Sequence, residues 1–324
     1  MYSTVPPRIG DAGRPGEGWG LRRAVRLAFP GPAELAGDTV HAGRLDVYLT
    51  DLLGQYEHKL ERGALERDAE PGGQSYGEMA EALIKLAVPD GESVDLLILA
   101  YAIPDITPGR ATATYLTHVC PGKPMAFAVS DQGAAAGFTG LRLIRDYAGT
   151  GGPRRALLLV VEQAELPYDL GVPVAVPTGH SGVALLFGDL TETSDTPGSP
   201  GSPGSPDRAR LDSVIDSVSV YPGLEGAALA DQVGALFAGT AGSPDTGGAT
   251  AILSAEFATR VPAPTGPSQV RIAAAGQPYT GVWWELAGAL AEAGTCGSRI
   301  LLADYAPESQ YLCFAAIDMA GGHR

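Results

Sequence analysis

The stretch MAFAVSDQGAAAGFTGLRLIRDYAGTGGPRRALLLVVE, residues 125–162, contains the clearest structural pattern of the chain. Met125–Ser130 and Arg154–Glu162 are short runs rich in apolar residues, which is typical of strands covered on both faces. Between them, a Gly/Ala-rich turn leads into Ala135–Ala148, where apolar residues recur at helical spacing. The stretch therefore predicts a strand, a turn, a buried helix and a second strand, as found in α/β folds.

The same alternation of strand and helix patterns extends in both directions. Ser93–Tyr101 is a further apolar run, Tyr76–Leu86 places apolar residues on one helical face, and Leu45–Thr50 predicts a strand. The other expected strands are Gly182–Phe187, Leu211–Val220, Ala251–Ser254, Val270–Ala274, Ser298–Asp304 and Tyr311–Ile317, and the other expected helices are Ala227–Ala238 and Val282–Ala293. This order favours a layered α/β fold.

A short repeat interrupts the pattern. Residues 197–206 read PGSPGSPGSP, a composition that cannot bury apolar surface and predicts a solvated loop or tether. We expect a flexible amino terminus over 1–22 and an amino-terminal half over 23–196. The loop over 197–207 then leads to a shorter second half, 208–324, which resembles a copy of the first.

Composition and charge exclude several classes of protein. The chain has 324 residues, of which 45% are hydrophobic, so wholesale disorder is excluded. Its net charge of −15 repels both a phosphate backbone and an anionic membrane surface. The longest apolar run, around Ala156–Val161, is too short to span a bilayer, and the first residues lack the apolar segment of a signal peptide. We therefore expect a soluble, cytoplasmic protein with no nucleic-acid or membrane partner.

Cysteine and histidine residues form no metal-binding motif. The cysteines are far apart and the histidines are scattered, so neither a disulfide framework nor a zinc site is expected. The residues concerned are Cys120, Cys296, Cys313, His41, His58, His118, His180 and His323.

Three stretches together resemble the thiolase superfamily, in particular β-ketoacyl-acyl-carrier-protein synthase III and its biosynthetic relatives. The first is residues 125–162, where the family has a strand, a tight Gly/Ala turn and a helix opened by a nucleophilic cysteine just before a Gly-Phe pair. The second is GHSGVALLF at Gly179–Phe187, which is similar to the family's Gly-Asp-Gly-Ala strand. The third runs from GQPYTG at 276–281 through the two closing strands. The resemblance covers most of residues 40–324.

This resemblance implies a fold and a set of partners. The fold is a five-layer αβαβα arrangement of two similar halves. Family members pair the strand before the nucleophile turn across a two-fold axis, which implies a dimer with a second copy or with a homologous ketosynthase-like chain. The substrate would be an acyl-CoA or a phosphopantetheine-linked acyl group, with an acyl carrier protein as a further partner. No cofactor or metal is expected.

The family's catalytic residues do not carry over to this chain. The cysteine position falls on Ala135, or on Ala134 if the longer turn is aligned the other way, and a methyl group cannot be acylated. The family's histidine position falls on Ala255, and its Gly-Asn-Thr-Ser asparagine falls on Gln277. Gln277 can still donate a hydrogen bond, whereas Ala255 cannot. Decarboxylative condensation by this chain alone is therefore not expected.

Several neighbouring side chains have two interpretations. His180 and Asp131 are either substitute acid–base groups or ordinary hydrogen-bonding residues of a strand start and an interface. Trp283 either narrows the acyl tunnel or packs in the core. The expected substrate-binding positions are Gln132, Ala134, Ala135, Gln277 and Trp283.

Two functional hypotheses follow. The first is a non-condensing partner subunit of an active ketosynthase-like chain, in the acyl or polyketide biosynthesis of a bacterial specialised metabolite. The alternative is an enzyme that uses an acyl thioester without a covalent intermediate, as an acyltransferase or a hydrolase. The intact pattern of the scaffold and the loss of the nucleophile are compatible with both.

Overall fold

The structure is a computed structural model, which describes residues 18–31, 38–55, 74–106, 111–150, 152–165, 174–190, 213–238, 248–262, 264–292 and 299–319. The strands in these ranges are β1 (Trp19–Ala28), β2 (Leu96–Ala100), β3 (Met125–Val129), β4 (Arg155–Glu162), β5 (Ser181–Asp189), β6 (Ser213–Tyr221), β7 (Ala249–Leu253), β8 (Gln269–Ile272), β9 (Arg299–Ala306) and β10 (Tyr311–Met319). The helices are α1 (Thr39–Gly54), α2 (Tyr76–Ala87), α3 (Thr112–Val119), α4 (Ala135–Gly149), α5 (Gly226–Ala238), α6 (Ala255–Arg260) and α7 (Gly281–Ala291).

The strands follow one another in the order β3-β2-β4-β5-β1-β6-β10-β9-β7-β8. A single pair of described residues, Leu21 and Ser213, joins β1 to β6, so two five-stranded sheets meet at this point. Gly20 permits the close approach, because a Cβ there would lie 1.7 Å from the carbonyl oxygen of Ser213.

The second sheet repeats the topology of the first. In the first sheet, β2 pairs in parallel with β3 and β4, and β5 pairs antiparallel with β4 and β1. In the second, β7 pairs in parallel with β8 and β9, and β10 pairs antiparallel with β9 and β6. Each strand from β1 to β5 therefore has a counterpart five numbers later.

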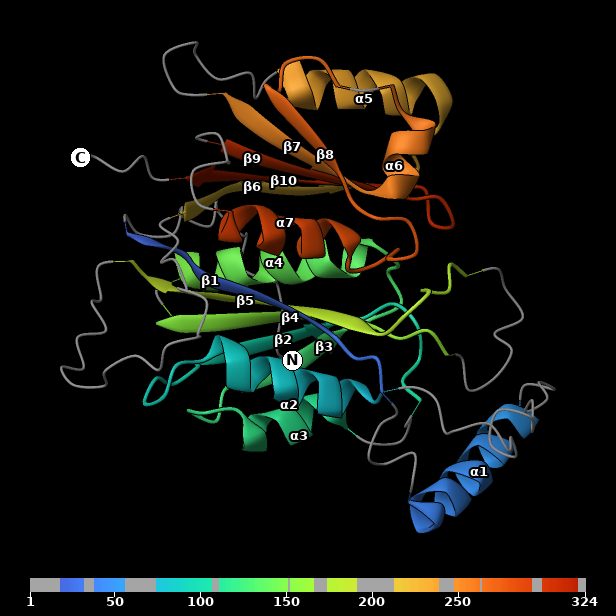
Figure 1. Ribbon diagram of the computed structural model, residues 1–324. Helices are drawn as coiled ribbons and strands as arrows, with labels where there is room; N and C mark the ends of the chain where they lie inside the picture. Colours follow the sequence, from blue (N-terminus) through green and yellow to red (C-terminus); the bar gives the residue numbers. More distant parts are fainter. Residues whose placement is uncertain are drawn as a thin grey trace, which may run out of the picture.

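The helices form three layers around the two sheets (Figure 1). Helices α4 and α7 lie between the sheets, α2 and α3 cover the outer face of the first sheet, and α5 and α6 lie on the outer side of the second. The expected five-layer αβαβα arrangement of two similar halves is therefore confirmed. Helix α1 lies outside these layers (Figure 1).

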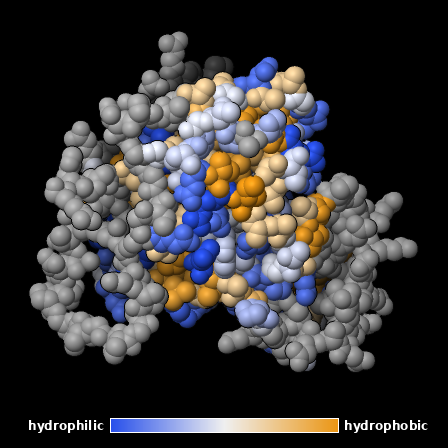
Figure 2. Space-filling model, turned by 45° about the horizontal axis from the view of Figure 1, so that its top comes forward, coloured by the Kyte–Doolittle hydropathy of each residue, from blue (hydrophilic) through white to orange (hydrophobic). Residues whose placement is uncertain are grey.

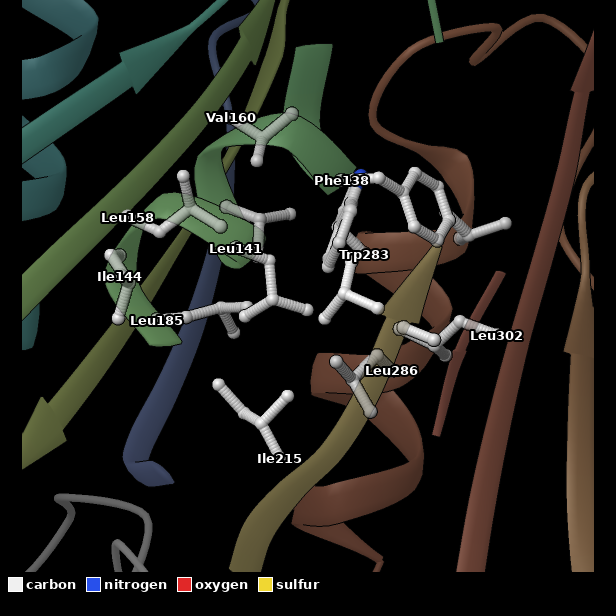
Figure 3. Close-up of a cluster of buried hydrophobic side chains, with 14 of the residues drawn as sticks. Phe138, Leu141, Ile144, Leu158, Val160, Leu185, Ile215, Trp283, Leu286 and Leu302 are labelled. Atoms are coloured by element: carbon white, nitrogen blue, oxygen red, sulfur yellow. The ribbon is translucent and has the colours of Figure 1, made fainter. Parts of the chain in front are cut away.

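The largest apolar cluster occupies the central layer. It joins α4 and α7 to the inner faces of both sheets, and its members include Phe138, Leu141, Trp283 and Leu286 (Figure 3). Gly137 on α4 allows the contact with α7, because a Cβ at this residue would lie 2.6–2.9 Å from three ring atoms of Trp283. The absence of a side chain at Gly137 thus lets the two central helices pack closely.

Most of the expected elements are present, with two corrections. Leu45–Thr50 is not a strand but part of α1, where Asp38 caps the amino end and Leu45, Leu49 and Leu53 are buried at four-residue spacing. The expectation of a flexible amino terminus over 1–22 is wrong for its last residues, since β1 begins at Trp19 and pairs with β5. The repeat at 197–206 lies outside the described residues.

Large apolar side chains remain exposed at both outer strands of the sheet order. Met125 on β3 is 50% exposed, and Val270 and Ile272 on β8 are 40% and 57% exposed. On the face of the molecule that carries α5, apolar and hydrophilic residues are interspersed (Figure 2).

Candidate functional site

The amino end of α4 lies at the tight turn that joins it to β3. The backbone of Asp131 and Gly133 is left-handed there, with φ values of 58° and 53°. Helix α4 starts at Ala135 without a hydrogen bond from a capping side chain. Ala306, at the end of β9 on the facing sheet, has its Cβ 3.7 Å from the place that a Cβ on Gly133 would take. The turn therefore lies directly against the end of β9.

Ala135 is fully buried at this helix start, and residues 133–136 carry neither a hydroxyl nor a thiol group. Ala255, the expected counterpart of the family's histidine, is the first residue of α6. The Nε2 of Gln277 donates one hydrogen bond to the Ser181 hydroxyl at 3.2 Å. Two of the three positions that the resemblance assigns to catalytic residues thus hold methyl groups, and the third makes an internal hydrogen bond.

A buried carboxylate, Glu162, accepts hydrogen bonds at the amino end of α7. Its Oε2 accepts from the backbone N–H groups of Tyr279 and Thr280 at 3.0 and 3.1 Å. Its Oε1 accepts from the hydroxyls of Thr280 and Ser181 at 2.5 and 2.9 Å. Burial raises the pKa of Glu162, and these hydrogen bonds oppose that rise because they stabilise the charged form. The arrangement caps α7 and ties it to the first sheet.

A second buried carboxylate, Asp304, lies in a polar row on the inner face of the second sheet. Ser254 follows β7, Asp304 lies on β9, and Cys313 on β10 is the cross-strand partner of Asp304. The Asp304 carboxylate accepts from the Ser254 hydroxyl and, at 2.7 Å, from the backbone N–H of Tyr305. Burial raises its pKa to about 7, and the charges of Glu256 and Glu308 contribute in the same direction.

Trp283 is wholly buried between α4 and α7. Its ring centre lies 4.9 Å from that of Phe138, and the two rings lie close together in Figure 3. The indole Nε1 has no hydrogen-bond partner among the described residues. A buried N–H without a partner costs about 1–3 kcal/mol, so the central layer contains an unused donor next to the first turn of α4.

The other expected residues lie at the edges of this region. His180 is half-buried at the start of β5, where its Nδ1 accepts from the Ala164 N–H at 3.1 Å. Burial lowers its pKa, which favours the neutral ring. Asp131 is exposed and accepts from the Ser130 hydroxyl at 3.0 Å, and Gln132 accepts from the Thr139 hydroxyl at 2.6 Å. All three therefore already have hydrogen-bond partners within their own half of the molecule.

Neither described cysteine has the surroundings of a nucleophile. Cys120 is buried at the end of α3, and burial raises the pKa of its thiol to about 12. Cys313 is fully buried, and its pKa is raised by burial and by Asp304. Cys296 and His323 lie outside the described residues. Within the described ranges, no group of three or more His, Cys, Asp or Glu residues could hold a metal ion, and no helix is long and apolar enough to cross a membrane.

Solved structures share this arrangement, whereas no protein-family model and no curated protein matches the chain. AbyA1, a tetronic acid condensing enzyme, superposes with a TM-score of 0.56 at 18% identity, over 93% of this chain and 99% of that one. The chain has a thiolase-like fold. A variant of OleA from Xanthomonas campestris, with bound lauric acid and lauroyl-CoA, gives 0.51 at 14% identity over 93% and 99% of the two chains. ChlB3, described as an acyltransferase, gives 0.52 at 15% identity over 93% and 97%.

The sequence interpretation missed both buried carboxylates. Glu162 and Asp304 each end an apolar run, where a charged residue normally marks the return of a strand to solvent. The available signal was the neighbouring strand: Ser181 is the residue paired with Glu162, and Cys313 is the residue paired with Asp304. A buried acid requires hydrogen-bond donors nearby, so polar residues at paired positions indicate such a site.

Proposed function

We propose that this chain is the non-condensing member of a pair of ketosynthase III-like subunits in bacterial acyl or polyketide biosynthesis. The observation that carries the proposal is the buried methyl group of Ala135 at the start of α4, where the resemblance places a nucleophilic cysteine. A methyl group neither attacks a thioester nor holds an acyl group.

Two further observations support this proposal. The Gln277 amide donates one of its two N–H groups to Ser181, which orients the side chain toward an internal partner. The indole of Trp283 packs on Gly137 and Phe138 and fills the space beside the first turn of α4. The scaffold is thus retained, while the groups required for condensation are absent or engaged.

The surface proposed for the partner is the outer edge of β3. Among the described strands, β3 pairs only with β2, and it carries the half-exposed Met125. Apolar strand edges at the end of a sheet are suited to pairing with a second strand. The partner would be a second copy of this chain or a homologous chain that has the cysteine.

A charge on this edge tests the interface. Met125→Glu should shift the assembly toward monomer in light scattering coupled to size exclusion, because two copies of the charge meet near the two-fold axis. Val270→Glu on β8, at the opposite end of the sheet order, is the matched control and should leave the mass unchanged. Equal behaviour of both variants contradicts the β3 interface.

The activity test compares the chain alone with the chain mixed with any cysteine-containing thiolase-fold protein that its own genome encodes. Acyl-CoA and acyl-carrier thioesters are supplied with a malonyl thioester, and thiol release, intact protein mass and β-ketoacyl products are followed. The proposal expects products only in the mixture, and at a higher rate than with the cysteine-containing chain by itself. Condensation by this chain alone contradicts it.

A second candidate function is acyl transfer or thioester hydrolysis without a covalent intermediate. The observation that favours it is Asp304, a buried carboxylate on the sheet face that meets the start of α4. Its pKa near 7 makes both protonation states available at neutral pH.

A further inference from the structure

Helix α1 lies outside the five layers, and it has apolar side chains on two opposite faces (Figure 1). Leu45, Leu49 and Leu53 are buried and form one face. Val40 and Val47 are 60% and 61% exposed, and the helical period places them about half a turn away from the leucines. A helix face that stays in solvent normally has polar residues, so the two valines indicate a further contact of α1.

Three other residues complete this exposed face. Arg44, Tyr48 and Asp51 are interleaved with Val40 and Val47 at three- and four-residue spacing, so all five lie on one side of the helix. We call these five residues the outer stripe of α1. Of the eight large apolar side chains that are exposed in the described part of the chain, three belong to this stripe. Apolar residues gathered in this way are typical of a contact surface.

Small residues flank the outer stripe on one side. Gly43 and Gly54 lie beside Val47 on the helix surface, four residues before it and seven after it. A Cβ added at either glycine would meet no atom within 4 Å. The surface beside the stripe is therefore open, and a second helix can approach α1 closely there.

The two charges of the outer stripe indicate which partner fits and in which direction. Arg44 and Asp51 are exposed and lie about 10 Å apart along the helix, which is too far for an ion pair within α1. In an antiparallel pair of α1 helices centred between Val47 and Tyr48, Arg44 of each copy lies at the level of Asp51 of the other. A parallel pair would instead bring like charges together at both levels. Charge complementarity therefore favours the antiparallel pair.

We propose that the outer stripe of α1 binds the outer stripe of a second copy of this chain, with the two helices antiparallel about a two-fold axis. Val47 and Tyr48 form the centre of this interface, and an ion pair between Arg44 and Asp51 forms at each end. The contact uses no residue of β3, so it goes beyond the proposed function and is independent of it. The 16 residues of α1 span about 24 Å, so the interface is small and the association should depend on protein concentration.

The test is sedimentation velocity of the purified full-length chain over a dilution series. Met125→Glu is the parent for every variant, so that pairing at β3 does not contribute. Arg44→Glu and Asp51→Arg each bring like charges together at both ends of the interface, and each should lower the association constant by roughly 10-fold or more. Asp46→Arg, at an exposed residue of α1 outside the stripe, is the control and should associate like the parent.

Mixing the two variants separates a lost contact from a damaged fold. In an equimolar mixture of Arg44→Glu and Asp51→Arg, two carboxylates of one chain lie at the levels of two guanidinium groups of the other, so association should return. A misfolded variant would not recover on mixing. Recovery together with an unchanged Asp46→Arg control supports the proposal.

Three results overturn the proposal. The first is a parent chain that remains monomeric over the whole series, which would leave the outer stripe to a different protein. The second is association that neither Arg44→Glu nor Asp51→Arg weakens. The third is a mixture of these two variants that remains dissociated.

Discussion

In the first half of the molecule the buried acid that ends β4 binds the amino end of a central helix, whereas in the second half the buried acid of β9, two residues before the end of its strand, has its described hydrogen bonds within its own half. Glu162 binds the amino end of α7 through four hydrogen bonds, and Asp304 is held by Ser254 and by the N–H of Tyr305. Both side chains are buried, so their different surroundings rather than their exposure distinguish them. The two halves thus each bury a carboxylate, one held by the start of a central helix and one held beside the strand ends of the second sheet.

The comparison also explains why the two central helices begin differently. The start of α7 has polar residues, Tyr279 and Thr280, whose N–H groups are satisfied by Glu162. The start of α4 consists of Gly133, Ala134 and Ala135, without a side-chain cap. The first N–H groups of α4 instead bond to backbone carbonyls of the turn, Ala135 to Gln132 at 3.0 Å and Ala136 to Gly133 at 3.2 Å.

The largest expected effect comes from removing the structural acid. Glu162→Ala leaves two buried N–H groups and two buried hydroxyls without their acceptor, so we expect a loss of roughly 3–5 kcal/mol in the free energy of unfolding. Urea unfolding followed by circular dichroism measures it. Asp216→Ala, an acid that binds Arg299 in a partly exposed ion pair, is the comparison and should cost much less. Equal losses of stability in the two variants would show that the buried hydrogen bonds of Glu162 contribute no more than an ion pair at the surface.

The second prediction concerns Asp304 and the pH dependence of the free energy of unfolding. The pKa of Asp304 rises from 3.8 to about 7 on folding, so the folded chain binds this proton more tightly than the unfolded chain. The stabilisation is fully present below about pH 4 and is lost as the pH rises through 7. The contribution is at most roughly 4 kcal/mol.

Urea unfolding at about pH 4.5, 6 and 7.5 tests this dependence in the wild-type chain and in Asp304→Asn. Because the variant has no proton to lose at this site, its stability should fall less over the same interval. Parallel curves for the two proteins would mean that Asp304 has an ordinary pKa and resembles an exposed acid.

A smaller effect tests the close contact between the two central helices. Gly137→Ala places a methyl group 2.6–2.9 Å from the rigid indole of Trp283, so we expect a loss of about 1–3 kcal/mol in thermal or urea unfolding. Gly140→Ala is the control, because its nearest neighbour is the terminal methyl group of Leu158, which can move aside. A control that costs as much as Gly137→Ala would show that the indole is not the obstacle.

The smallest effect on stability should come from restoring a thiol at the α4 start. Ala135→Cys adds a fourth cysteine, and we expect one adduct more than the wild-type chain forms when both are unfolded and treated with a small thiol reagent, measured by intact mass spectrometry. With acyl and malonyl thioesters it should form no β-ketoacyl product, because Ala255 donates no hydrogen bond from its side chain. The wild-type chain under the same conditions is the control. Product formation by Ala135→Cys alone would contradict the assignment of Ala255.

The sequence predicts the layered fold well where apolar runs are long and bounded by glycine. Met125–Ser130, Ala135–Ala148 and Arg154–Glu162 correspond to β3, α4 and β4, because local pattern and burial agree there. The strand predicted over Leu45–Thr50 is wrong. The six residues LDVYLT have strand-like alternation, whereas the helical spacing of the leucines is visible only over a longer window. A six-residue window can fit the two-residue period of a strand even when the residues on either side continue the 3.6-residue period of a helix.

The site is harder to predict than the fold because its contacts are distant in sequence. Glu162 and Thr280 are 118 residues apart, and no local pattern relates them. Ser254 directly follows β7 and Asp304 lies on the neighbouring strand β9, and the pairing of these strands depends on the order β10-β9-β7, which spacing alone does not reveal. Ala135 and Gln277 were found only because the resemblance supplied positions to inspect.

The methyl group of Ala135 determines the kinetic order of any acyl transfer at this helix start. An enzyme that stores the acyl group on itself releases its first product before the second substrate arrives, and it gives parallel lines in a double-reciprocal plot. Ala135 provides no such storage. Donor and acceptor must therefore be bound together, the lines must intersect, and a thioester that meets no acceptor leaves the protein unchanged.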